Sequence, residues 1–219
     1  MELNELSFGT PNQYNLILLD QESCLDSLLT ELKNYPFPAN ESEIVSQEIK
    51  ELIGYAEHLK KDEPSAKEML KRFMVYDADA GTFMINKLRS VGIDDKELRD
   101  TITEVKKDIS PLLIKLKYFY NRPRPYQLAY IKKLPLHAWK SISADSPSYP
   151  SSHAFQSRIY AEVLGNMFPK YYKALHEVAT DIMWSRLYLG VHYESDNEFS
   201  TYMADIVLKH PDFTKKYKL

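Results

Sequence analysis

Apolar residues recur at steps of three and four along most of this 219-residue chain, and this period constrains the fold more than any other feature. The clearest case begins at Asn40, with its apolar side chains at Val45, Ile49, Leu52, Ile53, Ala56 and Leu59. Such spacing places the apolar side chains on one face of an α-helix. Similar patterns predict helices over residues 21–35, 65–92, 94–109, 153–168, 169–189 and 195–209, with a restart at Ser110-Pro111. We therefore expect an all-α fold.

Length and composition favour one domain. A chain of 219 residues with 44% hydrophobic content suits a single sizeable core, and six glycines point to few turns. No internal repeat or change in composition divides the chain. We expect a single-domain helical bundle over residues 1–219, in which residues 1–110 supply helices without a motif and residues 111–209 carry the motifs described below.

Charge and targeting signals exclude several classes of protein. The formal net charge of -3 gives no overall electrostatic case for nucleic-acid binding. No apolar run approaches the length of a bilayer span, and Met1 to Thr10 does not resemble a signal peptide. Cys24 is the only cysteine, so an intramolecular disulfide is excluded. We expect a cytoplasmic protein without nucleic-acid or membrane partners, and self-association stays open.

A serine, an arginine, a histidine and an aspartate lie within the twelve residues from Ser185 to Asp196. The pattern predicts the end of one helix, a turn at Gly190 and the start of another helix, opened by a Ser195 to Glu198 capping box. An aspartate four residues after His192 can accept its imidazole N–H and leave the other ring nitrogen free to react. Taken alone, each residue is more simply a solvated surface residue. The interpretation changes because of two other segments.

Two further segments carry groups that bind anions. Lys117, Arg122 and Arg124 lie where a predicted helix ends, and Ser151, Ser152 and His153 lie where another begins. Arginine offers a planar fork to phosphate oxygens, lysine a point charge, and a capped helix N-terminus offers free N–H groups. Between them, residues 122–149 hold no regular pattern, and we interpret them as a packed functional loop.

One acidic pair is a decoy. Asp77 and Asp79 follow an apolar run and resemble the Asp-x-Asp of haloacid-dehalogenase-like phosphatases. That fold requires alternating strands and helices, whereas here a helical period continues from Ala66 to Leu88. A calcium loop is also disfavoured, because its twelfth position is Leu88 rather than a glutamate. We interpret both aspartates as part of a helix surface and expect no metal site.

Together, the three segments resemble the signature of the phosphatidic acid phosphatase type 2 superfamily, which includes soluble class A acid phosphatases and vanadium haloperoxidases. The signature reads Lys-x6-Arg-Pro, then Pro-Ser-Gly-His, then Ser-Arg-x5-His-x3-Asp. Lys117 to Pro125 and Ser185 to Asp196 match throughout, and Pro150 to His153 matches except that Ser152 replaces glycine. The resemblance implies a helical bundle of the acid phosphatase and haloperoxidase type.

The resemblance also implies a mechanism. His192 would attack phosphorus and form a phosphohistidine, Asp196 would orient its ring, and His153 would protonate the leaving alcohol. The residues that would hold the phosphate oxygens are Lys117, Arg124, Ser151, Ser152 and Arg186. No metal or other cofactor is implied. Glycine allows close backbone approach, but a helical conformation tolerates serine, so we expect activity to survive at Ser152.

Because lipid phosphatases of this family carry membrane spans, the resemblance favours a small, soluble phosphate ester as the substrate and an acid phosphatase-like phosphomonoesterase as the function. Vanadate bound in the same pocket would instead give a haloperoxidase, the only alternative with a cofactor. A non-catalytic helical module that binds anions is the other alternative.

The register of the first motif is ambiguous, because Lys115 with Arg122-Pro123 fits Lys-x6-Arg-Pro as well as Lys117 with Arg124-Pro125 does. Periodicity does not decide between them. Class A enzymes resemble the second choice, with aromatic residues after the lysine and an arginine two places before the Arg-Pro. We therefore assign Lys117 and Arg124 to the phosphate, and Lys115 and Arg122 to solvent or a structural ion pair.

Overall fold

The structure is a computed structural model that describes residues 3–93 and 96–219, and every regular element within those ranges is a helix. The α-helices are α1 (Gln13–Asp20), α2 (Leu29–Lys33), α3 (Glu43–Leu59), α4 (Pro64–Tyr76), α5 (Ala80–Arg89), α6 (Lys96–Tyr120), α7 (Pro125–Ile131), α8 (Ser152–Met167), α9 (Tyr172–Tyr188), α10 (Glu194–Val207) and α11 (Pro211–Tyr217). Three short 3-10 helices are η1 (Leu3–Glu5), η2 (Cys24–Leu28) and η3 (Pro169–Tyr171). The prediction of an all-α fold is confirmed.

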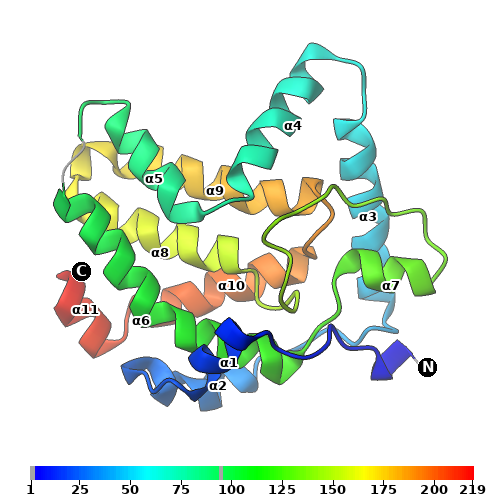
Figure 1. Ribbon diagram of the computed structural model, residues 1–219, viewed down its shortest axis with the longest axis horizontal. Helices are drawn as coiled ribbons and strands as arrows, with labels where there is room; N and C mark the ends of the chain where they lie inside the picture. Colours follow the sequence, from blue (N-terminus) through cyan, green and yellow to red (C-terminus); the bar gives the residue numbers. More distant parts are fainter. Residues whose placement is uncertain (1–2, 94–95) are drawn as a thin grey trace.

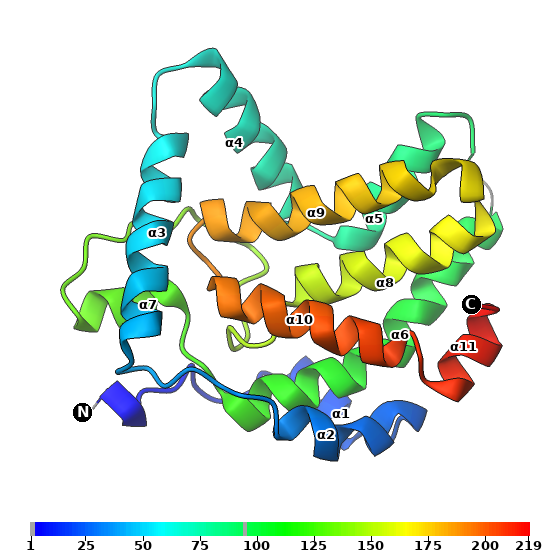
Figure 2. The same ribbon diagram turned by 180° about the vertical axis from the view of Figure 1, so that it is seen from behind.

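Helix α8 lies at the centre of the bundle. Helix α9 runs beside it, and α5, α6 and α10 pack around it, as Figures 1 and 2 show from opposite sides. Because other helices surround α8, apolar side chains are buried on more than one of its faces. They are Ala154, Phe155, Ile159, Tyr160, Ala161, Val163 and Leu164. A helix that is apolar around most of its circumference is expected at the centre of a core.

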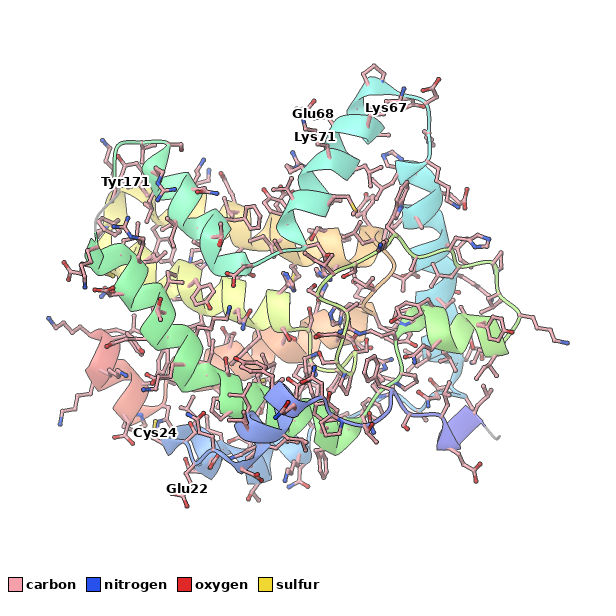
Figure 3. The ribbon with its side chains drawn as sticks, in the orientation of Figure 1. Glu22, Cys24, Lys67, Glu68, Lys71 and Tyr171 are labelled. Atoms are coloured by element: carbon pink, nitrogen blue, oxygen red, sulfur yellow. The ribbon has the colours of Figure 1, made fainter. Side chains whose placement is uncertain are left out.

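The N-terminal helices pack against the segments that carry the motifs. The apolar face predicted for α3 packs on Leu187 and Tyr193, on either side of the turn between α9 and α10. Helix α4 packs against α9 and contributes Phe73 to a cluster with Leu189 and Val191 of the same turn. Its outer turns carry the exposed side chains of Lys67, Glu68 and Lys71, which Figure 3 labels. Helices α3 and α4 therefore hold this turn in place.

The helix predicted over residues 65–92 is divided into α4 and α5. Asp79 has an extended backbone, with φ of -158°, and its carboxylate accepts from the N–H groups of Gly81 at 2.8 Å and Thr82 at 3.2 Å. This cap starts a new helix, as aspartate does at such positions. Asp77 lies in the break and is 1% exposed, so the interpretation of Asp77 as helix surface is wrong.

Other helix boundaries also differ from prediction. Helix α6 does not restart at Pro111: it runs unbroken to Tyr120, with Pro111 buried. Ser42 rather than Asn40 caps α3, and α10 begins after Tyr193 rather than at a Ser195 to Glu198 box. The predicted start at Asp94 lies outside the described residues.

The region predicted to be irregular, residues 122–149, contains α7. Its first residue, Pro125, suits the first turn of a helix because that position needs no N–H. Helix α1, for which no helix was predicted, packs on α6. In the described ranges, no helix combines the length and the apolar character needed to cross a membrane.

Candidate active site

The first motif is shaped by a sharp turn after α6. Asn121 ends this helix with φ of +46°, a left-handed conformation that asparagine tolerates better than most residues. Its side chain fixes the turn by accepting from the Gly9 N–H at 3.3 Å and donating to the Gly9 carbonyl at 3.1 Å. Arg124 then has an extended backbone and precedes α7, and its N–H donates to Gln127 Oε1 at 2.7 Å. The reversal brings Arg124 back beside Lys117.

The third motif turns at Gly190, as predicted. This glycine has φ of +72°, and a Cβ atom there would lie 3.3 Å from Ala138 Cα and Cβ. The loop after α7 is held against the turn, because the Trp139 N–H donates to the Leu189 carbonyl at 2.9 Å. Both the backbone conformation and the close approach favour glycine. The turn leaves His192 between the end of α9 and the start of α10.

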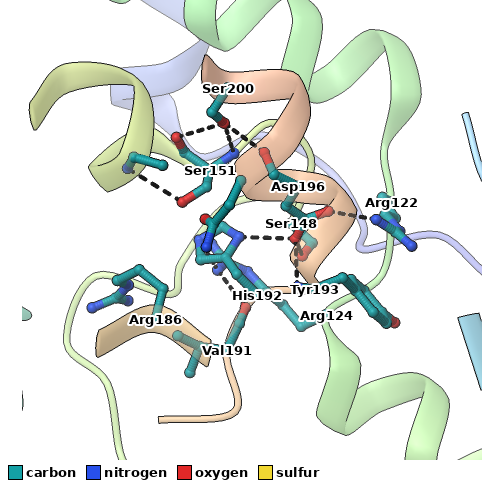
Figure 4. Close-up of polar contacts among 12 residues, drawn as sticks. Arg122, Arg124, Ser148, Ser151, Arg186, Val191, His192, Tyr193, Asp196 and Ser200 are labelled. Carbon is teal, nitrogen blue, oxygen red and sulfur yellow. Dashed lines mark hydrogen bonds and ion pairs between the residues drawn. The ribbon is translucent and has the colours of Figure 1, made fainter. Parts of the chain in front are cut away.

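His192 is almost fully buried, and both of its ring nitrogens have a partner (Figure 4). Nδ1 lies 2.9 Å from Asp196 Oδ2, and Nε2 lies 2.8 Å from Arg124 Nη1. Since a guanidinium can only donate, Nε2 accepts from Arg124, and the ring proton is assigned to Nδ1, which donates to Asp196. Burial and the Arg124 charge hold the pKa of His192 well below its usual value. The imidazole is therefore neutral, with Nε2 as its basic atom.

Asp196 accepts hydrogen bonds at both carboxylate oxygens. Oδ1 accepts from Arg122 Nη1 at 2.6 Å, and Oδ2 accepts from His192, from the Tyr193 N–H at 3.0 Å and from the Ser148 hydroxyl (Figure 4). Burial alone would raise the pKa of Asp196, but Arg122 and these hydrogen bonds hold it well below its usual range. The carboxylate stays ionised and fixes the imidazole ring.

All the buried Lys, Arg, Asp and Glu side chains of the described residues belong to one cluster. The four cations are Lys117, Arg122, Arg124 and Arg186, and the three carboxylates are Glu48, Asp77 and Asp196. Positive charge is therefore in excess when the histidines are neutral. Buried charges are normally paired, and the nearby carboxylate of Asp145 also acts on two of these cations, Lys117 and Arg124.

The excess resides on Lys117 and Arg124, whose hydrogen-bond acceptors are uncharged. Lys117 Nζ donates to the Pro147 carbonyl at 2.5 Å. Arg124 donates to the carbonyls of Ser146 at 2.8 Å and Val191 at 2.9 Å, besides His192. Burial and the charge of Arg124 lower the pKa of Lys117 well below its usual value, while burial and the charge of Arg186 lower the pKa of Arg124 to about 10.

Arg186 has a carboxylate partner from the N-terminal half. Its Nη1 donates to Asp77 Oδ1 at 2.7 Å, and Asp77 also accepts from the hydroxyls of Ser141 at 2.6 Å and Ser143 at 2.8 Å. Burial by itself raises the pKa of Asp77, but Arg186 and these hydrogen bonds lower it to about 2. The Arg186 Nε atom is buried without a partner. The break between α4 and α5 thus supplies a counter-charge.

A cavity of about 200 Å³ opens beside this cluster, and its wall includes Arg124, Ser152, His153 and His192. His153 lies in the first turn of α8, and its Nε2 atom is buried without a hydrogen-bond partner. Burial and the charge of Arg186 hold the pKa of His153 well below its usual value. Ser152 is helical, with no positive φ, so its backbone does not require glycine. The cavity wall thus holds two histidines and Arg124, and its other charged residues are Lys106, Asp79 and Asp145.

Other predicted residues lie behind this wall. The Ser151 hydroxyl accepts from the Ala154 N–H at 3.4 Å and caps α8. Lys117 and Arg186 are fully buried, and their charges act on His153 together with that of Arg124. Among the described residues, no group of three or more His, Cys, Asp and Glu side chains is arranged to hold a metal ion.

The two lysines of the ambiguous register lie in different surroundings. Lys115 forms an ion pair with Asp26 of η2 at 2.7 Å, whereas Lys117 joins the buried cluster. Arg122 is fully buried and pairs with Asp196 and with Glu48 of α3. Sequence reasoning missed Glu48, Asp77 and Ser148. For Asp77, the Asp-x-Asp pattern in the sequence was a usable signal, but we interpreted that pattern as part of a helix surface.

Comparisons with known proteins concern the fold and the motif-bearing half of the chain. No curated protein matches the chain in sequence. Among solved structures, the fold is similar to the "Crystal structure of the first transmembrane PAP2 type phosphatidylglycerolphosphate phosphatase from Bacillus subtilis", with a TM-score of 0.52 and 16% identity over 89% of this chain and 92% of that one. The PAP2 superfamily model matches residues 108–209, which contain all three motif segments. The match covers the motif-bearing half of the chain, which is therefore similar to the PAP2 superfamily.

Proposed function

We propose that this protein is a phosphatase that hydrolyses phosphate monoesters through a phosphohistidine on His192. The observation that carries the proposal is the buried excess of positive charge beside a histidine whose tautomer is fixed. Lys117 and Arg124 have only uncharged acceptors, so a phosphate group would supply the missing negative charge.

In the first step, a phosphate oxygen replaces His192 Nε2 as the acceptor of the hydrogen bond that Arg124 donates. This frees Nε2 to attack phosphorus in line with the leaving oxygen, so that an N–P bond forms as the P–O bond breaks. Asp196 holds the ring by Nδ1 and stabilises the positive charge that develops on it. Lys117, Arg124 and Arg186 stabilise the charge on the transferring phosphoryl group.

His153 is the group proposed to give a proton to the leaving alkoxide. Burial and the charge of Arg186 keep its pKa low and the ring neutral. A bound phosphate dianion opposes the nearby cations and raises that pKa, so the substrate itself favours the acid form. Once the alcohol has left, the neutral ring takes a proton from water, which attacks the phosphohistidine and releases phosphate.

The substrate we propose is a small, soluble phosphate ester, because residues Lys117 to Arg124 resemble those of class A acid phosphatases. The Bacillus subtilis protein of similar fold is a phosphatidylglycerolphosphate phosphatase, so its own substrate is a lipid phosphate. Activity is compared on a generic aryl phosphate, on sugar phosphates and on phosphatidylglycerolphosphate in detergent micelles. This panel distinguishes a soluble ester from a lipid phosphate as the substrate.

The test is phosphate release by the purified protein without added metal. We expect turnover of the aryl phosphate, its loss in His192→Ala, and inhibition by vanadate, whose trigonal-bipyramidal form imitates the transferring group. Bromination with added vanadate and peroxide would instead indicate a haloperoxidase, and phosphate binding without turnover an anion-binding module. The proposal is wrong if chelators abolish activity while His192→Ala and His153→Ala both retain it.

A further inference from the structure

We propose that Glu48 of α3 is a positioning residue for this site, which acts through Arg122 to set the charge that Asp196 offers to His192. The inference rests on the proposed function, but it concerns the N-terminal half of the chain, outside the three motif segments and outside the residues that match the family model.

Arg122 is confined between two carboxylates. Nη1 donates to Asp196 Oδ1 at 2.6 Å, and Nη2 donates to Glu48 Oε2 at 3.3 Å. The guanidinium carbon lies 3.7 Å from the centre of the Tyr193 ring, 5.5 Å from that of Phe37 and 5.8 Å from that of Tyr149. Arg122 is 0% exposed. Since aromatic rings enclose it, its charge is balanced by these two carboxylates rather than by water.

This arrangement determines how much of the Asp196 charge reaches His192. Arg122, bound at Oδ1 of Asp196, withdraws negative charge from that carboxylate. The other oxygen of the carboxylate, Oδ2, accepts from His192. Glu48 shares that cation and so offsets its effect, and charges act strongly on one another where water is excluded. Without the Glu48 charge, Arg122 would pair with Asp196 alone. His192 would then be less basic, and the positive charge that develops as it attacks phosphorus would be stabilised less.

Glu48 also holds the backbone that carries Asp196. Its Oε1 atom accepts from the Ser195 N–H at 2.6 Å, in the first turn of α10. A carboxylate at a helix N-terminus is favoured by the helix dipole. Burial raises the pKa of Glu48, while Arg122 and the Ser195 N–H oppose that rise. Glu48 therefore links α3, α10 and Arg122 at a single carboxylate.

The experiment compares Glu48→Gln with Glu51→Gln. The first change removes the charge but keeps an oxygen for the Ser195 N–H. The second removes a carboxylate one turn along the same helix, whose hydrogen bond is with Gln47 rather than Arg122. We expect Glu48→Gln to lower kcat about tenfold, or about 1.4 kcal/mol in the barrier, with KM changed less than about twofold. Glu51→Gln should match the wild type.

The pH profile gives a readout that a merely structural role would not change. The charges that act on the His192 ring are those of Asp196, Arg124 and Lys117. Because the Gln variant leaves more positive charge near the ring, the acid limb of kcat/KM should move to lower pH. If Glu48→Gln does not fold, Glu48→Met replaces it, because methionine also removes the charge: a lower kcat with an unchanged KM supports the role, and a wild-type kcat overturns it.

A second readout does not depend on turnover. The Nδ1 proton of His192, donated to Asp196, should give a low-field proton resonance in nuclear magnetic resonance spectra, identified by its loss in His192→Ala. We expect this resonance to move in Glu48→Gln and to stay in place in Glu51→Gln. Should wild-type protein show no phosphatase activity while this shift is seen, the proposed function fails and the positioning role stands. A wild-type resonance, kcat and pH profile in folded Glu48→Gln would overturn the inference.

Discussion

Replacing Lys117 by methionine should abolish most of the activity, whereas the same change at Lys115 should leave it intact. Both lysines lie in the last two turns of α6, and both satisfy the spacing of the first motif. Lys117 is 0% exposed and donates to the Pro147 carbonyl beside the histidines, while Lys115 pairs with Asp26 at the edge of the molecule. Methionine keeps much of the length of the lysine stem and removes the charge.

The magnitudes follow from these surroundings. Loss of one charge-assisted contact to the transferring phosphoryl group should cost about 2 to 4 kcal/mol in the transition state, or roughly 30- to 1,000-fold in kcat/KM. For stability, Lys117→Met leaves the Pro147 carbonyl unpaired, at about 1 to 3 kcal/mol, but also removes a desolvated cation next to Arg124. The two effects oppose each other, so we expect a small net change. Lys115→Met breaks a partly exposed ion pair worth up to about 1 kcal/mol.

The assay is kcat/KM for an aryl phosphate, with Tm measured on the same preparations. A large loss of kcat/KM in Lys115→Met with little change in Lys117→Met would refute the assignment of Lys117 to the first motif. If Lys117→Met lost activity only in proportion to unfolded protein, the argument that its charge contacts the phosphate would also fail.

Three further results are expected. His153→Ala should reduce kcat for alkyl phosphates more than for aryl phosphates, because poor leaving groups depend most on a proton donor; an equal loss on both would exclude this role. Phosphate at 100 times its Kd should stabilise the fold by about 2.7 kcal/mol in thermal melts, and Lys117→Met should reduce this effect; equal stabilisation by sodium chloride of matched ionic strength would contradict it. The pKa of Asp77, about 2 in the fold against 3.8 ordinarily, means that its ion pair stabilises the protein above about pH 4 and is lost as pH falls toward 2. In Asp77→Asn, the free energy of unfolding measured with urea should therefore depend less on pH over that window. An unchanged dependence on pH would contradict the low pKa of Asp77.

Helical periodicity predicted the long helices well, because other helices bury at least one face of each. It failed where a side chain interrupts the backbone without interrupting the apolar period. Asp79 starts α5 through its own carboxylate, although Ala66 to Leu88 continues the helical spacing. The short helix α7 was missed for a related reason: seven residues are too few to show a period, and its start at Pro125 was interpreted as part of a loop.

The motif spacing identified four residues of the cavity wall, Arg124, Ser152, His153 and His192, but not the carboxylates that pair with the buried arginines. Asp77 and Glu48 each lie in the N-terminal half, far along the chain from the arginines they contact. A single carboxylate in a polar stretch of an amphipathic helix has the same appearance whether solvent or an arginine lies against it. Its burial is decided by which helices pack together, and that information is not local in the sequence.

Arg122 and Arg124 show why burial alone does not assign a role to a cation. Both are almost fully buried, and only Pro123 separates them in the chain. Arg122 has two carboxylate partners, so a phosphate approaching it would meet a charge that is already balanced. Arg124 donates only to carbonyls and to His192, which a phosphate oxygen can replace as acceptor without leaving a carboxylate unpaired. The partner therefore decides what each arginine can bind: Arg124 is able to exchange an uncharged acceptor for an anion, whereas Arg122 is held against the carboxylate that accepts from His192.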